Sequence, residues 1–450
     1  MKRGLVWAKQ APMWPYHPDL LVRPVPRYTS FPTAAEFGPG VGSAEQAEAI
    51  GEVQEPLSLY LHIPFCEQIC WYCGCNTGAA NKAQRLTSYL DALGSEIDLV
   101  ASMMPDDVGI ARISFGGGSP NAIPPLSFVR LLDRTSTAFG ASAPVLSVEL
   151  DPRGFTPEWA SVLGATGVTN VSLGVQTFED AIQHRIGRIQ PARLIDSTVR
   201  QLRGVGVRSI NFDLMYGLPG QTMGDLEATL AHSIGLAPER IALFGYAHVP
   251  HILPRQRRID DSALPDQALR FAMAEHGYDQ LTAAGYVPIG FDHFALPHDP
   301  MAKAAAAGEL RRNFQGFTDD PAERLIGMGA SAISCFPDRI VQNEKNAGRY
   351  RMRLSQGQLT GTHGIMRSRD DRERALVIED ILCGRSADLS MVLETPGAAE
   401  GLLPFIDRDL VRLDGMLLSP VDATRPYART IAALFDPYRV DAARRFSSAV

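Results

Sequence analysis

Four of the six cysteines fall within ten residues, as Cys66, Cys70, Cys73 and Cys75. Their spacing is C-x3-C-x2-C-x-C, and they follow the segment LSLYLHIPF, in which apolar residues alternate up to Pro64. Such alternation is typical of a β-strand that runs into a loop. Cysteine thiolates ligate iron–sulfur clusters. Three thiolates this close can hold three irons of a cubane cluster and leave the fourth iron open to another ligand.

Two other uses of these cysteines remain as alternatives. A zinc site usually has paired C-x2-C units with a second pair, or two histidines, further along the chain. The remaining cysteines, Cys335 and Cys383, are single and distant, and they are most simply small hydrophobic residues of the interior. A disulfide is the second alternative, although cysteines at such short gaps are crowded for one. The spacing therefore favours a cluster.

Composition limits the class of protein. A chain of 450 residues, 45% of them hydrophobic, can form one large domain and a small one. Its net charge of −7 argues against nucleic-acid binding through a basic surface. No apolar run reaches the ~18 residues of a membrane helix, and the N-terminus lacks the apolar core of a signal peptide. We therefore expect a cytoplasmic protein, because a reducing compartment keeps thiolates free.

After residue 56 the chain repeats a strand, a loop and a helix. The expected strands are 57–63, 111–115, 145–150, 170–175, 209–215 and 240–247. The expected helices are 86–100, 128–139, 157–163, 191–205, 223–236 and 263–284. Strands that alternate with helices form parallel sheets with right-handed crossovers. Six such units predict an α/β fold, an incomplete (β/α)6 barrel of the TIM type.

Each expected strand ends at glycine or polar residues, and in such barrels the site lies at the carboxyl ends of the strands. Three glycines, 116–118, would let backbone approach a ligand, with a tight turn as the alternative. Glu149 and Asp213 need partners if buried: a ribose hydroxyl, an amino group, or simply a helix arginine. Gln176 is a further polar contact, and Arg188 could meet a carboxylate in a fork geometry.

The first residues of the chain depart from this pattern. Residues 1–50 are rich in proline and aromatic residues, which predicts an extended arm lying on the main body. Residues 51–363 would form the barrel and its extension. Within that extension the glycines of 327–334 are expected to form another close-approach loop.

The C-terminal residues 364–450 are expected to form a separate, small and mostly helical domain. A helix over 372–382 would be capped by Asp370 or Asp371. A helix, a hairpin around Asp414 and Gly415, and another helix would follow, as in a winged-helix domain. The acidic residues of this region argue against DNA binding.

Short motifs along nearly the whole chain give it a close resemblance to one family. They are PRYTSFPT, LYLHIPFC, CWYCGCN, FGGGSPN, VELDPR, SLGVQTF, NFDLMYGLPGQT, YAHVP, FDHFA, RNFQGFT, GMGASAIS and QNEK. Together they resemble the oxygen-independent coproporphyrinogen III oxidases, which are radical S-adenosylmethionine (SAM) enzymes. The resemblance implies a radical SAM barrel and a role in haem biosynthesis.

The resemblance also implies the chemistry and its partners. Cys66, Cys70 and Cys73 would hold a [4Fe-4S] cluster whose open iron binds SAM. Cleavage of SAM would yield a 5′-deoxyadenosyl radical that abstracts hydrogen from propionate side chains of coproporphyrinogen III. Two propionates would lose CO2 and become vinyl groups, giving protoporphyrinogen IX. The implied partners are the substrate, an unidentified electron donor and a terminal electron acceptor, with no nucleic acid, no membrane span and a monomeric enzyme.

The family's cofactor contacts match positions of this chain, and a second SAM is expected beside the first. These positions are Tyr60, Tyr72, Gly117, Gly118, Ser119, Glu149, Gln176, Arg188, Asp213, Ala247 and Ile333. Ser119 stands where threonine is usual, and Tyr72 where phenylalanine is usual. Tyr60, Glu149 and Cys75 are the expected catalytic residues.

Cys75 also bears on which branch of the family the chain resembles. It is not expected to bind iron, and the resemblance implies that it marks oxidases rather than the related haem chaperones. A radical SAM haem chaperone or a haem-degrading methyltransferase stays as an alternative, as does a zinc-binding structural protein. Arg27 in the arm is a candidate for holding a substrate carboxylate.

Overall fold

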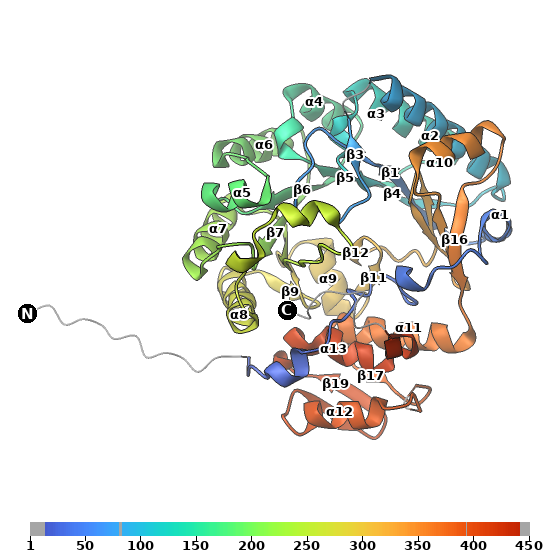
Figure 1. Ribbon diagram of the computed structural model, residues 1–450. Coiled ribbons are helices and arrows are strands. Elements are labelled where there is room, and N and C mark those ends of the chain that lie inside the picture. Colours follow the sequence, from blue (N-terminus) through green and yellow to red (C-terminus); the bar gives the residue numbers. More distant parts are fainter. Residues whose placement is uncertain (1–13, 81–82, 393, 442–450) are drawn as a thin grey trace, which may run out of the picture.

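A computed structural model describes residues 14–80, 83–392 and 394–441 (Figure 1). Its centre is a twelve-stranded sheet of order β16-β15-β14-β13-β1-β4-β5-β6-β7-β8-β10-β9. The strands from β13 to β8 run parallel. They are β13 (Leu325–Met328), β1 (Leu57–Ile63), β4 (Ile110–Gly117), β5 (Val145–Leu150), β6 (Asn170–Gln176), β7 (Ser209–Tyr216) and β8 (Arg240–Gly245).

The sheet curls into a barrel that stays open, because antiparallel strands follow β8 on one side and β13 on the other. Helices lie along the outside of the curl (Figure 1). They are α2 (Ala83–Met103), α3 (Pro125–Ala138), α4 (Pro157–Ala165), α5 (Asp180–Ile186), α6 (Ala192–Gly204), α7 (Met223–Leu236) and α8 (Gln267–Ala283). The six expected strands are all present, and the incomplete α/β barrel is confirmed.

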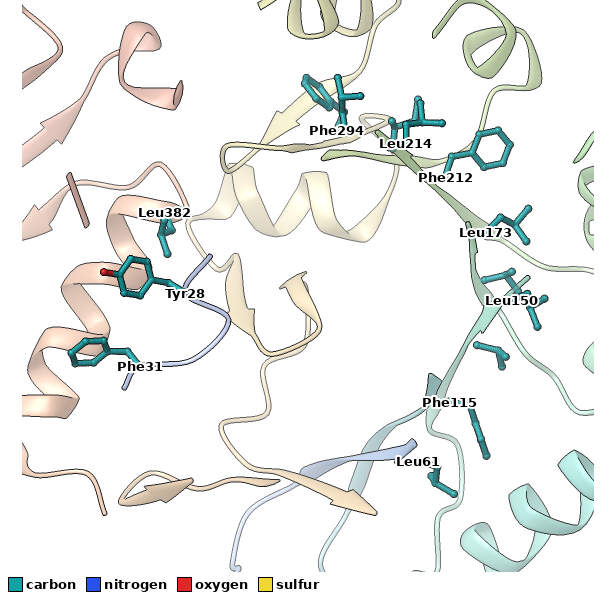
Figure 2. Close-up of a cluster of buried hydrophobic side chains, with 14 of the residues drawn as sticks. Tyr28, Phe31, Leu61, Phe115, Leu150, Leu173, Phe212, Leu214, Phe294 and Leu382 are labelled. Atoms are coloured by element: carbon teal, nitrogen blue, oxygen red, sulfur yellow. The ribbon is translucent and has the colours of Figure 1, made fainter. Parts of the chain in front are cut away.

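Alternation along the strands separates the core from the barrel interior. Figure 2 shows Leu61, Phe115, Leu150, Leu173 and Phe212 pointing from the sheet toward the outer helices, and all five are at most 4% exposed. Residues one position away must face the other side, since side chains alternate along a strand. The register aligns those inward positions in rows, one of which pairs Glu149 with Ser172 and Ser172 with Asn211. The barrel interior is therefore polar.

The region after β8 contains more strands than expected. A hairpin, β9 (Val287–Ile289) and β10 (His293–Ala295), extends the sheet beside β8. A separate hairpin, β11 (Arg311–Asn313) and β12 (Gly316–Thr318), follows α9 (Pro300–Ala307).

The segment 327–334, expected to be a loop, instead spans the end of β13, a turn and the start of β14 (Ile333–Cys335). Its glycines do serve close approach, because a Cβ on Gly327 would lie 2.4 Å from the Ile333 carbonyl oxygen. The partner here is the neighbouring strand rather than a ligand. β15 (Arg339–Asn343), α10 (Ala347–Ser355) and β16 (Gly361–Met366) complete the sheet.

The N-terminal arm lies on the body, as expected. Trp14 and Tyr16 pack on Phe271 of α8, and the Tyr28 hydroxyl donates to Asp436 at 2.9 Å. The described arm contains two short 3-10 helices, Pro18–Leu21 and Ala34–Glu36, and then α1 (Ser43–Gly51). The described proline-rich segment is thus extended only outside the two 3-10 helices. Residues 1–13 lie outside the described part.

The C-terminal region is built around α11 (Arg369–Leu382). The expected cap is wrong: the helix begins earlier, and its N-cap is Ser368, whose hydroxyl accepts from the Asp371 N–H while the Asp371 carboxylate accepts from the Ser368 N–H. Asp371 is thus the third helical residue of a capping box. β17 (Ala387–Asp388), α12 (Ala398–Ile406), β18 (Val411–Asp414), β19 (Leu417–Pro420) and α13 (Ala428–Ala432) follow.

The hairpin around Gly415 is present, and β17 joins it to make a three-stranded sheet. Before α11 in the sequence, β16 continues to Met366 as part of the barrel sheet. The barrel sheet thus extends three residues past 363, the expected boundary. Within the described residues, no helix is long and apolar enough to cross a membrane.

Candidate active site

The cysteine loop begins where β1 ends. Cys66 lies in the short strand β2 (Phe65–Cys66), which pairs with β3 (Gly78–Ala79), so the loop between them is closed at its base. The Trp71 N–H donates to the Ile186 carbonyl oxygen at 3.1 Å and ties the loop to α5. Cys66 and Cys70 are buried, Cys73 is half-buried and Cys75 is exposed. Of the four residues, Cys75 is thus the most exposed.

The charges around these thiols suit thiolate ligands. Cys70 Sγ accepts from Arg153 Nη2 at 3.2 Å and from Arg188 Nη1 at 3.3 Å. Asp151 bonds to both arginines, at 2.6 Å and 3.2 Å. Burial acts to raise the pKa of Asp151, but Arg188 and Arg153 outweigh it and hold that pKa below its usual range. The two guanidiniums are fixed in place and can stabilise negative sulfur.

The thiols differ in acidity in the absence of a ligand. Burial raises the pKa of Cys66 to about 12. A hydrogen bond from the Cys75 side chain lowers the pKa of Cys73 to about 6. The same bond, together with burial of the thiol group, raises the pKa of Cys75.

Among the described residues, no group of three His, Cys, Asp or Glu side chains converges closely enough to hold one metal ion. A cubane cluster does not require such convergence, because each thiolate binds its own iron. Cys66, Cys70 and Cys73 therefore form a donor set that fits a cluster. They lie in one loop at a strand end, and two arginines donate to Cys70.

The glycine loop, which comprises Gly116 and Gly117 at the end of β4 and Gly118 after it, has no room for side chains. A Cβ on Gly118 would lie 2.5 Å from the Phe65 carbonyl oxygen, one residue before Cys66. Gly117 has φ +111, and a Cβ there would lie 2.4 Å from the His62 ring. A Cβ on Gly116 would meet the Glu149 carboxyl at 2.7 Å. All three positions thus require glycine to bring β1, β4 and β5 together.

Glu149 is the carboxyl at the end of β5. It accepts from the Gly117 N–H at 3.1 Å, and burial raises its pKa to about 7, with Asp213 acting in the same direction. Asp213 on β7 accepts from Ser172 Oγ at 3.1 Å and Asn211 Nδ2 at 2.9 Å. Burial raises the pKa of Asp213 despite these bonds. No guanidinium pairs with either carboxyl among the described residues, so the salt-bridge alternative does not hold and both can accept from a ligand.

Gln176 and Arg188 both approach Gly174 of β6, where an added Cβ would lie 3.2 Å from Gln176 Nε2 and 2.9 Å from Arg188 Nη2. Gln176 has a left-handed φ of +61, and its buried Oε1 has no hydrogen-bond partner among the described residues. A buried acceptor without a partner is uncommon in folded proteins, so a bound ligand is expected to satisfy it. Arg188 donates to the Gly174 carbonyl oxygen, Gln190 Oε1, Asp151 and Cys70. The guanidinium of Arg188 therefore binds both the Asp151 carboxylate and the Cys70 sulfur.

Tyr60 lies inside the barrel on β1. Its hydroxyl lies 3.1 Å from His62 Nδ1, and its ring meets Phe314 edge-on at 5.1 Å. Burial raises the pKa of Tyr60 well above its usual value and lowers the pKa of His62 to about 4. Near neutral pH the pair is therefore a protonated phenol and a neutral imidazole.

The remaining expected residues lie around the edge of the site. Tyr72, in the cysteine loop, and Ala247, after β8, are joined through Gln256 Nε2, which donates to both carbonyl oxygens at 3.0 Å. The Ser119 hydroxyl is already engaged, because it donates to Asn121 Oδ1 and accepts from the Asp151 N–H at 3.1 Å. Ile333 begins β14 and is half-buried.

A cavity in the barrel interior joins several of these residues. Glu149, Asp213, Phe244, His293 and Phe317 line it. The cavity is therefore surrounded by β4, β5, β6, β7, β8, β10 and the β11–β12 hairpin, although these elements are far apart in the sequence.

Sequence reasoning missed the pair behind Cys70. Asp151 and Arg153 belong to the motif VELDPR. An aspartate two residues before an arginine could have indicated the pair, because Asp151 caps the 3-10 turn Pro152–Gly154 and accepts from Arg153. His62, in LYLHIP, was also missed. Alternation from Tyr60 on the same strand could have found it, since residues two apart face the same side.

Known proteins are similar to this chain over most of its length. The sequence model of the Radical SAM superfamily matches residues 60–232. The chain is 41% identical over 425 residues to an oxygen-independent coproporphyrinogen III oxidase of Bradyrhizobium diazoefficiens, covering 92% of this chain and 94% of that protein. It is 38% identical to coproporphyrinogen III oxidase, anaerobic 1, of Cereibacter sphaeroides, covering 93% and 95%.

A solved structure agrees over the same span. Coproporphyrinogen III oxidase (HemN) from Escherichia coli, described as a radical SAM enzyme, matches with a TM-score of 0.86 and 34% identity. The match covers 92% of this chain and 97% of that chain.

Proposed function

The chain belongs to the oxygen-independent coproporphyrinogen III oxidase family, and from this we propose that it oxidatively decarboxylates two propionates of coproporphyrinogen III to vinyl groups. It is a radical SAM oxidoreductase that uses a [4Fe-4S] cluster and SAM. The product is protoporphyrinogen IX, on the route to haem. The names of the relatives favour this function over a haem chaperone or a haem-degrading methyltransferase.

One observation supports the proposal: the glycines 116–118 contact the start of the cysteine loop, at the Phe65 carbonyl oxygen, and also Glu149 of the polar barrel, through the Gly117 N–H. Cys66, Cys70 and Cys73 would hold the cluster, and SAM would occupy its open iron. Together these cofactors supply the one-electron chemistry that generates a hydrogen-abstracting radical. The protein's part is to bind, orient and exclude water.

The residues of the barrel can divide that work. Gly117 and Gly118 give close backbone approach beside the cysteine loop. Gln176 Oε1, which has no partner among the described residues, can accept from a cofactor N–H or O–H. Glu149, with a pKa of about 7, can accept from an ammonium or donate when protonated.

The other expected contacts are proposed in weaker roles. Tyr60 would orient a bound group through its hydroxyl, and Asp213 would accept from one. Cys75 lies beside Cys73, to whose sulfur its N–H donates at 3.4 Å, and would act on the substrate side rather than as a ligand. Tyr72, Ala247 and Ile333 would offer backbone or ring surface. Ser119 and Arg188 would act through the neighbours to which they bond.

The finer partners are also proposals. We propose two SAM molecules per chain, a monomeric enzyme, and a cytoplasmic location in which the six cysteines stay reduced. An electron donor must reduce the cluster, and a terminal acceptor must take the last electron from the substrate. Equilibrium dialysis of SAM and light scattering of the purified protein measure the first two.

The deciding experiment is an anaerobic incubation of the reconstituted protein with coproporphyrinogen III, SAM and a reductant. Chromatography of the oxidised porphyrins should show one and then two propionates replaced by vinyl groups, with release of CO2. The proposal fails if neither product nor CO2 forms while the protein binds haem at one equivalent.

A further inference from the structure

Five arginines gather beside the barrel mouth, where the arm, the barrel and the C-terminal region meet. They are Arg27, Arg270, Arg312, Arg425 and Arg429. A cavity at this meeting point is lined by Arg27, Arg425 and Arg429 together with Asp292 and Phe291. All five side chains are half-buried.

Each arginine is held in place by backbone carbonyls or aromatic faces. Arg27 donates to the Gly245 carbonyl oxygen at 2.9 Å and lies 5.0 Å from the centre of the Phe244 ring. Arg312 donates to the carbonyl oxygens of Arg27 and Tyr28, at 2.9 and 3.0 Å. These contacts fix the guanidiniums of Arg27 and Arg312 but do not neutralise them, because carbonyls and rings carry no net charge.

The negative charge within this group is small. Asp292 bonds to His293 Nδ1 at 2.6 Å and is the carboxylate that acts on both Arg312 and Arg429. Glu379 also acts on Arg312 but bonds to Arg311 at 3.1 Å.

The arginines disfavour one another's charge. Burial lowers the pKa of Arg429 to about 10, and Arg27 and Arg312 act in the same direction. Donors also remain unused, because Arg312 Nη1, Arg270 Nε and Arg425 Nε are buried without a hydrogen-bond partner among the described residues. Half-buried cations with spare donors and mutual repulsion would be stabilised by an anion.

The cluster adjoins the barrel cavity through aromatic rings. The Phe244 ring under Arg27 meets His293 at 5.5 Å, and both side chains line the cavity that contains Glu149. Phe317 lines the same cavity and lies 4.3 Å below the Arg312 guanidinium. Apolar ring surface therefore leads from the reaction space to the cations.

We propose that Arg27, Arg312 and Arg429 form a carboxylate-binding site that holds propionates of the porphyrinogen while another propionate lies in the barrel. The inference rests on the proposed function for the identity of the ligand. The pyrrole rings would lie over Phe244 and Phe317. The site explains why the arm is placed on the body, since Arg27 completes it.

Anaerobic equilibrium binding tests the site without turnover. The cluster-loaded enzyme, without reductant, is titrated with coproporphyrinogen III and with its tetramethyl ester. Wild type should bind the acid more tightly than the ester. Arg27→Gln and Arg429→Gln should each weaken binding of the acid by about 10- to 100-fold and leave the ester unchanged, because a charge-assisted bond is lost. Arg27→Lys should retain part of the preference for the acid.

Arg23→Gln is the matched control, because Arg23 is an exposed arginine of the same arm and should bind as wild type does. Iron content and melting temperature show whether each variant is folded. If Arg27→Gln does not fold, Arg27→Lys replaces it in the binding test. Equal affinity of wild type for acid and ester, or no effect of Arg27→Gln and Arg429→Gln, overturns the site. Turnover is measured separately. If binding depends on these arginines but no vinyl product forms, the oxidase function alone is refuted. If vinyl product forms but binding does not depend on these arginines, the site alone is refuted.

Discussion

At the scale of single residues, the four clustered cysteines have different environments. Cys66 and Cys70 are buried, and Cys73 is half-buried beside them, whereas Cys75 is exposed. We expect Cys66→Ser, Cys70→Ser and Cys73→Ser to lower iron from about four per chain to near zero after anaerobic reconstitution, because each removes one of three thiolate ligands. Cys75→Ser should retain the iron. Iron and sulfide analysis makes the comparison, and a Cys75→Ser protein without iron would show that the ligand set is misassigned.

Glu149 offers a test of pH dependence. Its pKa is raised to about 7 in the folded protein, so the folded state holds a proton that the unfolded state has lost between about pH 4.5 and 7. Stability from this group is therefore lost as pH rises through that window. Glu149→Gln, which cannot ionise, should be about 1–3 kcal/mol more stable than wild type above pH 7 and gain little at pH 4.5.

Denaturant unfolding of both proteins without SAM, at several pH values, measures the difference. The variant should also lose most of its oxidase activity, since the proposed function uses the carboxyl. A stability difference that does not change with pH would contradict the raised pKa.

Other single residues show what sequence can reveal locally. Glu149, Gln176 and Asp213 were expected at strand ends, and alternation places them in one barrel. The missing partner of Gln176 Oε1 could not be inferred, since it depends on which side chains from other strands reach it.

At the scale of elements, strand alternation was the strongest sequence signal, and glycines the most ambiguous. In β1, β4, β5, β6 and β7 apolar residues recur at every second position, whereas β8 has a short continuous apolar run. β13 was missed because Gly327 and Gly329 were taken to indicate a loop. Gly327 lies in a strand, and glycine is needed there because the backbone of Ile333 in β14 approaches it closely. No local sequence pattern indicates this approach.

The contact between the glycine loop and the cysteine loop can be tested by adding one methyl group. In Gly118→Ala the new Cβ would lie 2.5 Å from the carbonyl oxygen of Phe65. Because that neighbour is backbone, β4 and the cysteine loop must separate. We expect the free energy of unfolding to fall by about 1–3 kcal/mol and iron content to fall with it.

Gly235→Ala is the matched control for this change. Gly235 lies in α7 with nothing within 4 Å of an added Cβ, so alanine should be neutral or should stabilise by up to about 1 kcal/mol. Denaturant unfolding and iron analysis of the two variants make the comparison. Full iron content and stability in Gly118→Ala would show that the two loops do not constrain each other.

At the scale of the whole molecule, three parts of the chain meet around the barrel mouth. Arg27, Arg312 and Arg429 come from the arm, the β11 hairpin and α13. The sequence named Arg27 only as a candidate, because residues separated by about 285 and 117 positions share no periodicity. Their proximity is a property of the tertiary fold, and it gives the arm and the C-terminal region a proposed role in substrate binding.

The hydrogen bond between Tyr28 and Asp436 ties the arm to the C-terminal region and tests that role. Both residues are buried, and the bond is 2.9 Å. Tyr28→Phe leaves a buried carboxyl oxygen without this donor, which should cost about 1–3 kcal/mol. Because Tyr28 adjoins Arg27, a looser arm should raise the KM for coproporphyrinogen III by up to about tenfold with kcat little changed, since fewer molecules have the site complete.

Tyr286→Phe provides the comparison that separates substrate binding from general stability. The Tyr286 hydroxyl is also buried, and it donates to the Pro238 carbonyl oxygen at 2.7 Å within the barrel, away from the arm. This variant should lose similar stability and keep the KM of wild type. Anaerobic kinetics and denaturant unfolding of both variants decide the matter. An unchanged KM in Tyr28→Phe, or an equal rise in Tyr286→Phe, would mean that arm docking does not set substrate affinity.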